Sequence, residues 1–372
     1  MALDFTFTDE HEELRATLRS FFEQHSDEQA VRTQMASERG HDPAVWQQMA
    51  EELGLAGLII DEEYGGAGFS YVELLIAMEE MGRALLCSPF LGTAVFAANV
   101  LKLAADETTQ KELLTGIAAG QQVVSVAHAE PNGRWDVAGI RLEAALSSDG
   151  HSLTGTKAWV LDGHCADVLL VVARVDGGLG LFRVAGDAAG LTRTLVPSLD
   201  TTRKLAHLTL DGTPAQLVSA GDQSAAITQA IALTVAALTA EQVGGSQKCL
   251  EMAVEYAGSR LQFGRPIGSY QSIKHKCADM LVSVEFGKSA AYNTCFAAAA
   301  QQEDFLETAA LAKSYCSEAY FRAAADTIQI HGGMGFTWEH PAHLYFKRAK
   351  ASEILFGDPC YHREVLAGLV GI

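Results

Sequence analysis

The chain has 372 residues, 48% of them hydrophobic, and a formal net charge of −19 at pH 7. Such a length allows two or three domains that share substantial cores. The negative charge opposes nonspecific binding to DNA and to anionic membranes, so we expect neither nucleic acid nor membrane as a partner.

No apolar run approaches transmembrane length, and Met1–Asp4 does not begin a signal peptide, so we expect a cytoplasmic protein. The seven cysteines are scattered between Cys87 and Cys360 without a C-x-x-C pair, which favours reduced, mostly buried thiols. The twelve histidines show no H-E-x-x-H or comparable spacing, so we expect no metal site.

Residues 1–120 are predicted to form an N-terminal all-helical domain. Thr8 can cap a first helix, on which Leu14, Leu18 and Phe22 repeat near helical spacing. Residues 61–68 contain three glycines and are predicted to form a loop. Residues 74–84 are predicted to form a further helix that carries two acidic residues on a polar face, Glu79 and Glu80.

Residues 121–222 are predicted to form a middle β domain. Strand candidates at 123–129, 152–160, 167–175, 179–184 and 205–210 are separated by Asp-Gly and Gly-Gly turns. Strands at short intervals without intervening helices favour an antiparallel sheet or a small barrel. No G-x-G-x-x-G motif follows a strand, which disfavours a Rossmann nucleotide site.

Residues 223–372 are predicted to form a C-terminal helical bundle, with long apolar runs at 225–238, 274–299 and 305–329. The predicted fold class is therefore α+β and multidomain. It combines an N-terminal helical domain, a middle antiparallel β-barrel-like domain and the C-terminal bundle.

Two motifs interrupt the C-terminal helices. The first, at 260–268, reads Arg-Leu-Gln-Phe-Gly-Arg-Pro-Ile-Gly, and its glycines and proline predict a tight corner between two long helices. Such a corner can hold a phosphate through paired hydrogen bonds, or its arginines can be solvated in a simple αα-hairpin. The second motif, at 329–337, places adjacent glycines at a helix end, where a ligand can approach the backbone closely.

The order Arg-x-x-Phe-Gly-x-x-Ile-Gly, then Gln-x-x-Gly-Gly-x-Gly, resembles the C-terminal domain of the acyl-CoA dehydrogenase family. The helical–β–helical order resembles that fold across essentially the whole chain. In this family one subunit lends both motifs to the FAD of its neighbour. The resemblance implies FAD, an acyl-CoA substrate, an electron-transfer flavoprotein or similar acceptor, and a homo-oligomer or a hetero-oligomer with a related subunit. It implies cofactor-binding roles for Arg260, Phe263, Gln271, Gln329, Gly332 and Gly333.

The resemblance is weaker in the β domain. Residues 155–163 resemble the family stretch Gly-x-Lys-x-Trp-Ile-Thr-Asn-Gly, which implies that Trp159 packs near the flavin; a buried core tryptophan is the alternative. The family threonine that bonds the flavin edge is Leu161 here. Residues 129–136 resemble Thr-Glu-Pro-Gly-x-Gly-Ser-Asp but lack the threonine and serine that contact FAD. The β-domain half of the implied flavin site is therefore eroded, and the C-terminal half is intact.

The implied reaction needs a carboxylate base in a mostly apolar pocket. The two positions that carry it in the family correspond to Phe356 and Thr234, neither of which can act as base. Glu241 lies seven residues beyond Thr234, nearly on the same helix face and among apolar or small neighbours, and is our candidate catalytic residue. The alternative is a buried pair with an arginine or lysine. Asp358 is a second carboxylate, which contacts a ribose or caps the segment that begins at Tyr361.

Two hypotheses of function follow. In the first, the chain is a self-sufficient enzyme that dehydrogenates an acyl-CoA thioester to the 2-enoyl-CoA with FAD. In the second, it is a non-catalytic subunit of a mixed oligomer that donates its C-terminal motifs to a partner's flavin, as in some family members that act on steroid side chains. Glu241 favours the first hypothesis and the eroded β domain favours the second. A related flavin oxidase or monooxygenase is a third, weaker interpretation.

Overall fold

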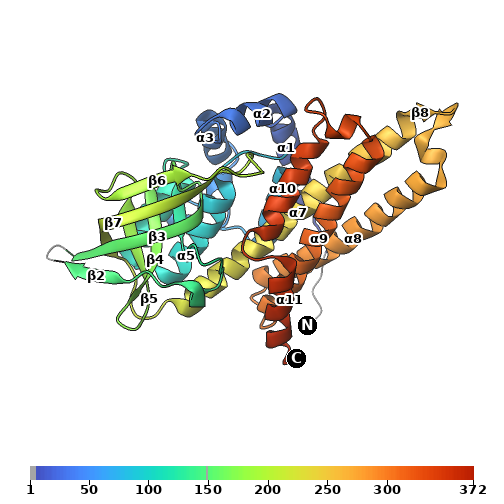
Figure 1. Ribbon diagram of the computed structural model, residues 1–372. Coiled ribbons are helices and arrows are strands. Elements are labelled where there is room, and N and C mark those ends of the chain that lie inside the picture. Colours follow the sequence, from blue (N-terminus) through green and yellow to red (C-terminus); the bar gives the residue numbers. More distant parts are fainter. Residues whose placement is uncertain (1–5, 148–149) are drawn as a thin grey trace. The chain divides into compact units, whose positions relative to one another are not determined.

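The computed structural model describes residues 6–147 and 150–372, and these form two compact units (Figure 1). A helical unit comprises the chain up to Arg32, Tyr71–Leu86 and Val235–Ile372. A sheet unit comprises Thr33–Ser70 and Cys87–Thr234. The N-terminal helices are thus shared between the two units, and the division of the sequence at residues 120 and 222 stays a prediction.

The helical unit contains seven α-helical segments of the described chain. They are α1 (Asp9–His25), α4 (Tyr71–Arg83), α7 (Ser224–Ser259, from Val235 onward), α8 (Gln271–Ala299), α9 (Phe305–His331), α10 (Ala342–Ile354) and α11 (Pro359–Leu369). Thr8 begins α1 as predicted, because its hydroxyl accepts the N–H of His11 and the His11 ring accepts the N–H of Thr8. The three C-terminal runs predicted as helices lie within α7, α8 and α9.

Helix α7 crosses α4 with the two backbones in contact. A Cβ built on Gly82 of α4 would lie 2.0 Å from the Glu241 carbonyl oxygen, and one built on Gly244 of α7 would lie 1.8 Å from the Glu79 carbonyl oxygen. Neither position can therefore carry a side chain without separating the helices. Glycine at both positions allows the two helix backbones to come into contact, although glycine lowers the intrinsic helix propensity.

The acidic residues predicted on α4 are buried and paired. Glu79 and Glu80 are 7% and 2% exposed. Arg15 of α1 lies 2.7 Å from Glu79, and Arg19 makes two hydrogen bonds of 2.9 and 2.7 Å to Glu80. The Tyr292 hydroxyl of α8 donates to Glu79 at 3.0 Å. The predicted polar face of α4 is thus buried and paired with α1 and α8.

Seven strands form the sheet of the sheet unit: β1 (Val124–Ala127), β2 (Ala144–Ser147), β3 (Gly150–Leu161), β4 (Val168–Val175), β5 (Gly178–Ala185), β6 (Leu191–Leu195) and β7 (Leu205–Leu217). Their order is β1-β4-β5-β7-β3-β2, with β6 paired to β7. Most pairs are antiparallel as predicted, but β1 and β4 are parallel. The long connection through β2 and β3 permits this, because parallel neighbours need a crossover.

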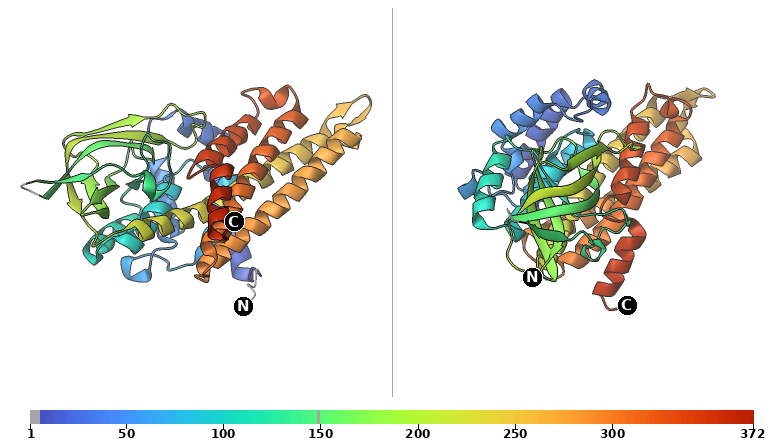
Figure 2. Two further views of the ribbon diagram at one scale, coloured as in Figure 1. Left: turned by 60° about the horizontal axis from the view of Figure 1, so that its bottom comes forward. Right: turned by 60° about the vertical axis from the view of Figure 1, so that its left-hand side comes forward.

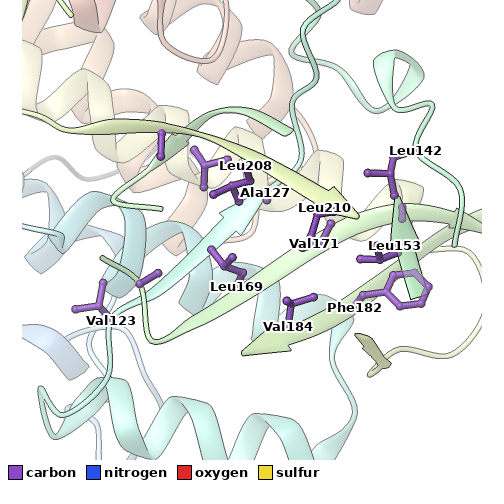
Figure 3. Packing of buried hydrophobic residues seen from close by; sticks show 14 residues of the cluster. Val123, Ala127, Leu142, Leu153, Leu169, Val171, Phe182, Val184, Leu208 and Leu210 are labelled. Carbon is purple, nitrogen blue, oxygen red and sulfur yellow. The ribbon is translucent and has the colours of Figure 1, made fainter. Parts of the chain in front are cut away.

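Apolar side chains from β1, β3, β4, β5 and β7 meet in one core, which Figure 3 shows from close by. The other α-helices in the described residues are α2 (Glu28–Ala36), α3 (Pro43–Glu51), α5 (Ala98–Ala104) and α6 (Glu107–Ala118), and α5 is preceded by the π-helical segment η3 (Leu91–Ala97). Strands β2 and β6 were not predicted from the sequence. They are only four and five residues long, so a short alternation such as that of β6 gives a weak signal in the sequence.

Helix α7 is more apolar than the sequence analysis suggested. By length and composition it could cross a membrane, with a window of mean hydropathy 1.3, but 56% of that window is buried within the protein. A core helix passes the same test, so a single helix of this kind is weak evidence for a membrane span.

The crossing of α4 and α7 predicts the effect of Gly244→Ala. The added methyl group would overlap the Glu79 carbonyl, so we expect a loss of about 1–3 kcal/mol in the free energy of unfolding. Gly258 is the matched control, because it lies in the same helix and a Cβ there would meet no atom of the described chain within 4 Å. Gly258→Ala should leave stability unchanged or raise it by up to about 1 kcal/mol. Equal behaviour of both variants in denaturant titrations would contradict the close crossing.

Candidate flavin corner and buried acid pair

The first motif forms the predicted corner between α7 and α8, with a small hairpin added. Strands β8 (Leu261–Gln262) and β9 (Arg265–Pro266) pair across Phe263 and Gly264, whose φ angles are +51° and +80°. Two successive residues with positive φ are typical of a type I′ hairpin turn. This conformation turns the Phe263 side chain outward, where 93% of it is exposed.

The second motif lies beside the first within the helical unit. Helix α9 ends at His331, whose ring stacks on Tyr256 near the end of α7 with centroids 4.3 Å apart. Both views in Figure 2 show the hairpin projecting at the end of α7 and α8. Cβ atoms built on Gly264, Gly332 and Gly333 would meet no atom of the described chain within 4 Å. The two motifs therefore form one open corner, which we call the flavin corner; its exposed residues with predicted roles are Arg260, Phe263, Gln271, Gln329, Gly332 and Gly333.

This corner can serve a bound molecule that comes from outside the helical unit. An exposed guanidinium can make two charge-assisted hydrogen bonds to a phosphate, and the exposed ring can cover an apolar or planar group. The open glycines admit close approach to the backbone. The Arg265 guanidinium, in contrast, lies 4.1 Å over the Tyr270 ring within the corner itself.

Glu241 is buried and paired with an arginine. The Glu241 carboxylate is 4% exposed, and its Oε1 accepts a hydrogen bond of 3.1 Å from Arg348 of α10, which is 2% exposed. Arg348 also donates to the Leu86 carbonyl at 3.3 Å. The interpretation of Glu241 as half of a buried ion pair is thus confirmed. Its role as the catalytic base stays a prediction.

The two positions that carry the base in the family contain no carboxylate in this chain. Phe356 is 1% exposed and has φ of +60° in the loop between α10 and α11. The Thr234 hydroxyl is buried and donates to the Ala230 carbonyl at 2.7 Å. Asp358 accepts the N–H of Tyr361 at 2.8 Å and caps α11, which confirms the capping interpretation; contact with a ribose stays a prediction.

Trp159 lies in the sheet unit within a β-bulge of β3, at a φ of +51°. Its ring packs against Trp135 with centroids 5.9 Å apart and against His207 at 6.0 Å. Trp135 also lies 6.0 Å from His128. Sequence reasoning named Trp159 but missed this aromatic cluster. Trp135 occupies the place of the family serine in the stretch 129–136, and that substitution is the signal that could have revealed the cluster.

Two residues that match the family motifs have a structural role in the sheet unit. Lys157 is fully buried, and its ammonium lies 2.8 Å from the Glu130 carboxylate and 3.1 Å from the His128 carbonyl. Glu130 also accepts the N–H groups of Arg141 and Leu142. Burial lowers the pKa of Lys157 to about 8, although Glu130 acts to raise it. The matching residues Lys157 and Glu130 thus pair with each other inside the sheet unit, whereas Leu161 and Trp135 supply no hydroxyl.

Comparison with known proteins shows the family. The acyl-CoA dehydrogenase N-terminal domain matches residues 8–121, and the C-terminal domain matches residues 224–370. The chain is 36% identical to acyl-CoA dehydrogenase IpdE2 of Mycobacterium tuberculosis, across 85% of this chain and 82% of that protein. It is 29% identical to the human mitochondrial short-chain specific acyl-CoA dehydrogenase, across 85% of this chain and 80% of that protein.

Solved structures agree with this assignment. The ChsE4–ChsE5 complex from Mycobacterium tuberculosis superposes with a TM-score of 0.90 and 26% identity over 99% of both chains. A variant of the Tcur3481–Tcur3483 steroid ACAD gives a TM-score of 0.88 and 30% identity over 98% of both chains. The chain therefore belongs to the acyl-CoA dehydrogenase family of oxidoreductases, and the predicted fold class is confirmed. Members of this family are FAD-binding flavoproteins, as the motifs implied.

The buried pair predicts an asymmetry between two variants. Arg348→Met leaves the Glu241 carboxylate buried without this partner, so we expect a loss of about 3–5 kcal/mol in the free energy of unfolding. The double variant Glu241→Gln with Arg348→Met removes both charges and should recover a large part of that loss. Denaturant titrations of the parent, of Arg348→Met and Glu241→Gln alone, and of the double variant measure the coupling. Additive losses would show that the two side chains do not form a pair that matters for stability.

Proposed function

We propose that this chain takes part in the FAD-dependent α,β-dehydrogenation of an acyl-CoA thioester to the 2-enoyl-CoA as one subunit of a mixed oligomer. In this proposal it donates the flavin corner to an FAD whose sheet-side contacts come from a related partner chain. One observation carries the proposal: the flavin corner is open and exposed, whereas the family's base positions hold Phe356 and a Thr234 hydroxyl that is already hydrogen-bonded.

The residues present fit FAD at the flavin corner. Arg260 would bind the pyrophosphate, Phe263 would cover an apolar part of the cofactor, and the backbone at Gly332 and Gly333 would allow close approach. The sheet side fits less well, because Leu161 and Trp135 stand where family hydroxyls contact the cofactor. When bound, FAD supplies the acceptor for the β-hydride. This chain's contribution is then to bind and orient the cofactor.

The base would come from the partner chain. Removal of the α-proton needs a carboxylate that is free to accept it, and Glu241 is engaged by Arg348. The names of two neighbours, a complex of ChsE4 with ChsE5 and a steroid ACAD with two components, support a mixed oligomer and favour a steroid-derived acyl group. An electron-transfer flavoprotein or a similar acceptor would take the electrons, and we place the complex in the cytoplasm.

A self-sufficient dehydrogenase is the second candidate. It is favoured by Glu241, a buried carboxylate that lies seven residues beyond Thr234 in α7. In this case Arg348 would have to release the carboxylate when substrate binds. Glu241→Gln would then lower turnover by about 10²–10⁴ while flavin stays bound. Turnover of the Glu241→Gln variant at the parental rate would remove Glu241 from catalysis.

The visible spectrum of the purified chain separates the two candidates. The proposal predicts a colourless protein when the chain is expressed alone and a yellow complex when it is co-expressed with a related acyl-CoA dehydrogenase chain that carries the family glutamate. In that complex we expect fewer flavins than chains, because this chain's sheet side lacks the hydroxyl contacts. One tightly bound flavin per chain in the protein expressed alone would overturn the proposal and favour the self-sufficient enzyme.

A substitution at the flavin corner tests the role of Arg260. Lysine keeps the charge but cannot make two parallel hydrogen bonds to a phosphate, so Arg260→Lys should weaken FAD binding by the complex roughly tenfold. Arg322→Lys is the matched control, since Arg322 is 71% exposed on α9 and pairs only loosely with Glu318 at 3.6 Å. Flavin release on dilution, followed by fluorescence, provides the measurement. Identical FAD dissociation constants for the two variants would exclude Arg260 from the site.

A further inference from the structure

Lys313 of α9 is completely buried, and its ammonium group is surrounded by oxygen atoms. It donates to the Ser352 carbonyl at 3.0 Å, to the Glu353 carbonyl at 2.9 Å and to the Gly357 carbonyl at 3.0 Å. A fourth contact, at 3.0 Å, joins it to the Ser317 hydroxyl one turn further along α9. None of these four hydrogen-bond contacts is with a carboxylate.

The three carbonyls belong to the end of α10 and to the loop that follows it. Ser352 and Glu353 lie in the last turn of α10, whose carbonyls lack partners within the helix, and Gly357 lies in the loop before α11. Buried carbonyls need donors, and the three N–H groups of an ammonium can supply them. The ammonium thus joins the end of one helix to the loop that leads into the next.

The loop needs such support because its backbone is strained. Phe356 has φ of +60°, which is uncommon for a residue with a bulky side chain. Gly357, with φ of +109°, has no side chain to oppose this region. The His362 ring of α11 contributes a further contact, with its Nε2 lying 3.0 Å from the Phe356 carbonyl oxygen. The contacts of Lys313 with the Gly357 carbonyl and of His362 with the Phe356 carbonyl hold the loop in the conformation that keeps Phe356 inside the protein.

A buried polar chain extends from this loop to the middle of α7. The Gln242 amide donates to the Ser317 hydroxyl at 3.0 Å, and that hydroxyl is the fourth contact of Lys313. Gln242 is fully buried and follows Glu241 directly. The chain Gln242–Ser317–Lys313–Gly357 therefore connects α7 to the loop of Phe356, the two segments that carry the base in the family.

We propose that Lys313 is a positioning residue: its buried amine fixes the α10–α11 loop, and with it Phe356, against α7. The loop would border the acyl end of the site, and that part of the statement rests on the proposed function. The positioning of the loop itself depends on neither flavin nor a partner chain.

The surroundings of Lys313 change its own pKa and that of the neighbouring His362. Burial lowers the pKa of Lys313 to about 7, against the Glu353, Cys316 and Asp358 groups, which act to raise it. Burial, and after it the nearby charge of Lys313, lowers the pKa of His362 to about 4. Lys313 is charged at the pH where His362 titrates, so the pKa of His362 is sensitive to the charge of Lys313.

Lys313→Met tests the proposal, because methionine fills a similar volume but supplies no donor. Amide hydrogen exchange of residues 355–362 in the full chain should accelerate at least about tenfold, since loss of one hydrogen bond to a charged group already has an effect of about this size. The pKa of His362, followed by exchange of its ring C–H or by histidine NMR, should rise toward the ordinary value, because the neighbouring charge is gone.

Lys350→Met is the matched control. Lys350 lies near the end of α10, the helix whose last carbonyls contact Lys313. It pairs with the Glu353 side chain at 2.9 Å, but it is partly exposed and makes no contact within the buried polar chain. It should change neither the exchange of the loop nor the pKa of His362. If Lys313→Met does not fold, Lys313→Gln, which retains an amide donor but no charge, is measured instead, and we expect the same rise in the His362 pKa with a smaller change in exchange.

The outcomes separate this proposal from the proposed function. Parental exchange of the loop together with a parental His362 pKa in a folded Lys313 variant would overturn the positioning role. Both measurements use the chain alone, so they stand whether or not the chain binds flavin. Suppose that the parent chain expressed alone binds one flavin per chain, and that the Lys313 variant shows faster loop exchange and a raised His362 pKa. The mixed-oligomer proposal would then be wrong, and the positioning role of Lys313 would still hold.

Discussion

The helical unit depends on the crossing of α4 and α7. Their backbones touch at Gly82 and Gly244, so each helix fixes the axis of the other. On α4 this contact lies beside Glu79 and Glu80, which join α1 and α8 through arginines and a tyrosine. On α7 it lies beside Glu241, which joins α10 through Arg348. The tight crossing and the charged contacts reinforce each other, because any separation of the helices would expose or break buried ion pairs.

The same arrangement explains why acidic residues in this sequence are ambiguous. A lone carboxylate in an apolar helix is typical both of a catalytic acid and of a buried ion pair, and the difference lies in a partner that is distant in sequence. Arg348 is 107 residues from Glu241, and Arg15 is 64 residues from Glu79. Apolar periodicity predicts which face of a helix is buried, but it does not predict which cation faces the acid. The ion pairs of Glu241 with Arg348 and of Glu79 with Arg15 therefore follow from the folded structure and not from the sequence pattern.

Much of the fold was predictable because it rests on local signals. The capping residue Thr8, the runs that became α8 and α9, and the breakers at Gly264 and Pro266 each act within a few residues. What the sequence did not predict depends on contacts across the fold. The parallel pairing of β1 with β4, the distribution of the N-terminal helices over two units, and the role of Lys313 all involve segments far apart in the chain. Asp358 is intermediate, since its capping contact is local and was one of two predicted roles.

The two halves of the implied flavin site differ in where their side chains find contacts. At the flavin corner, a positive φ at Phe263 and open space at Gly332 leave side chain and backbone turned outward, where the described chain makes no use of them. In the sheet unit, Trp135 and Trp159 pack on each other, and the motif residues Lys157 and Glu130 satisfy one another in the interior. The corner is therefore exposed and equipped to contact something outside the chain, whereas the sheet motif now fulfils needs inside it. An open, outward-facing corner and a sheet motif that is satisfied in the interior are the two features on which the proposed mixed oligomer rests.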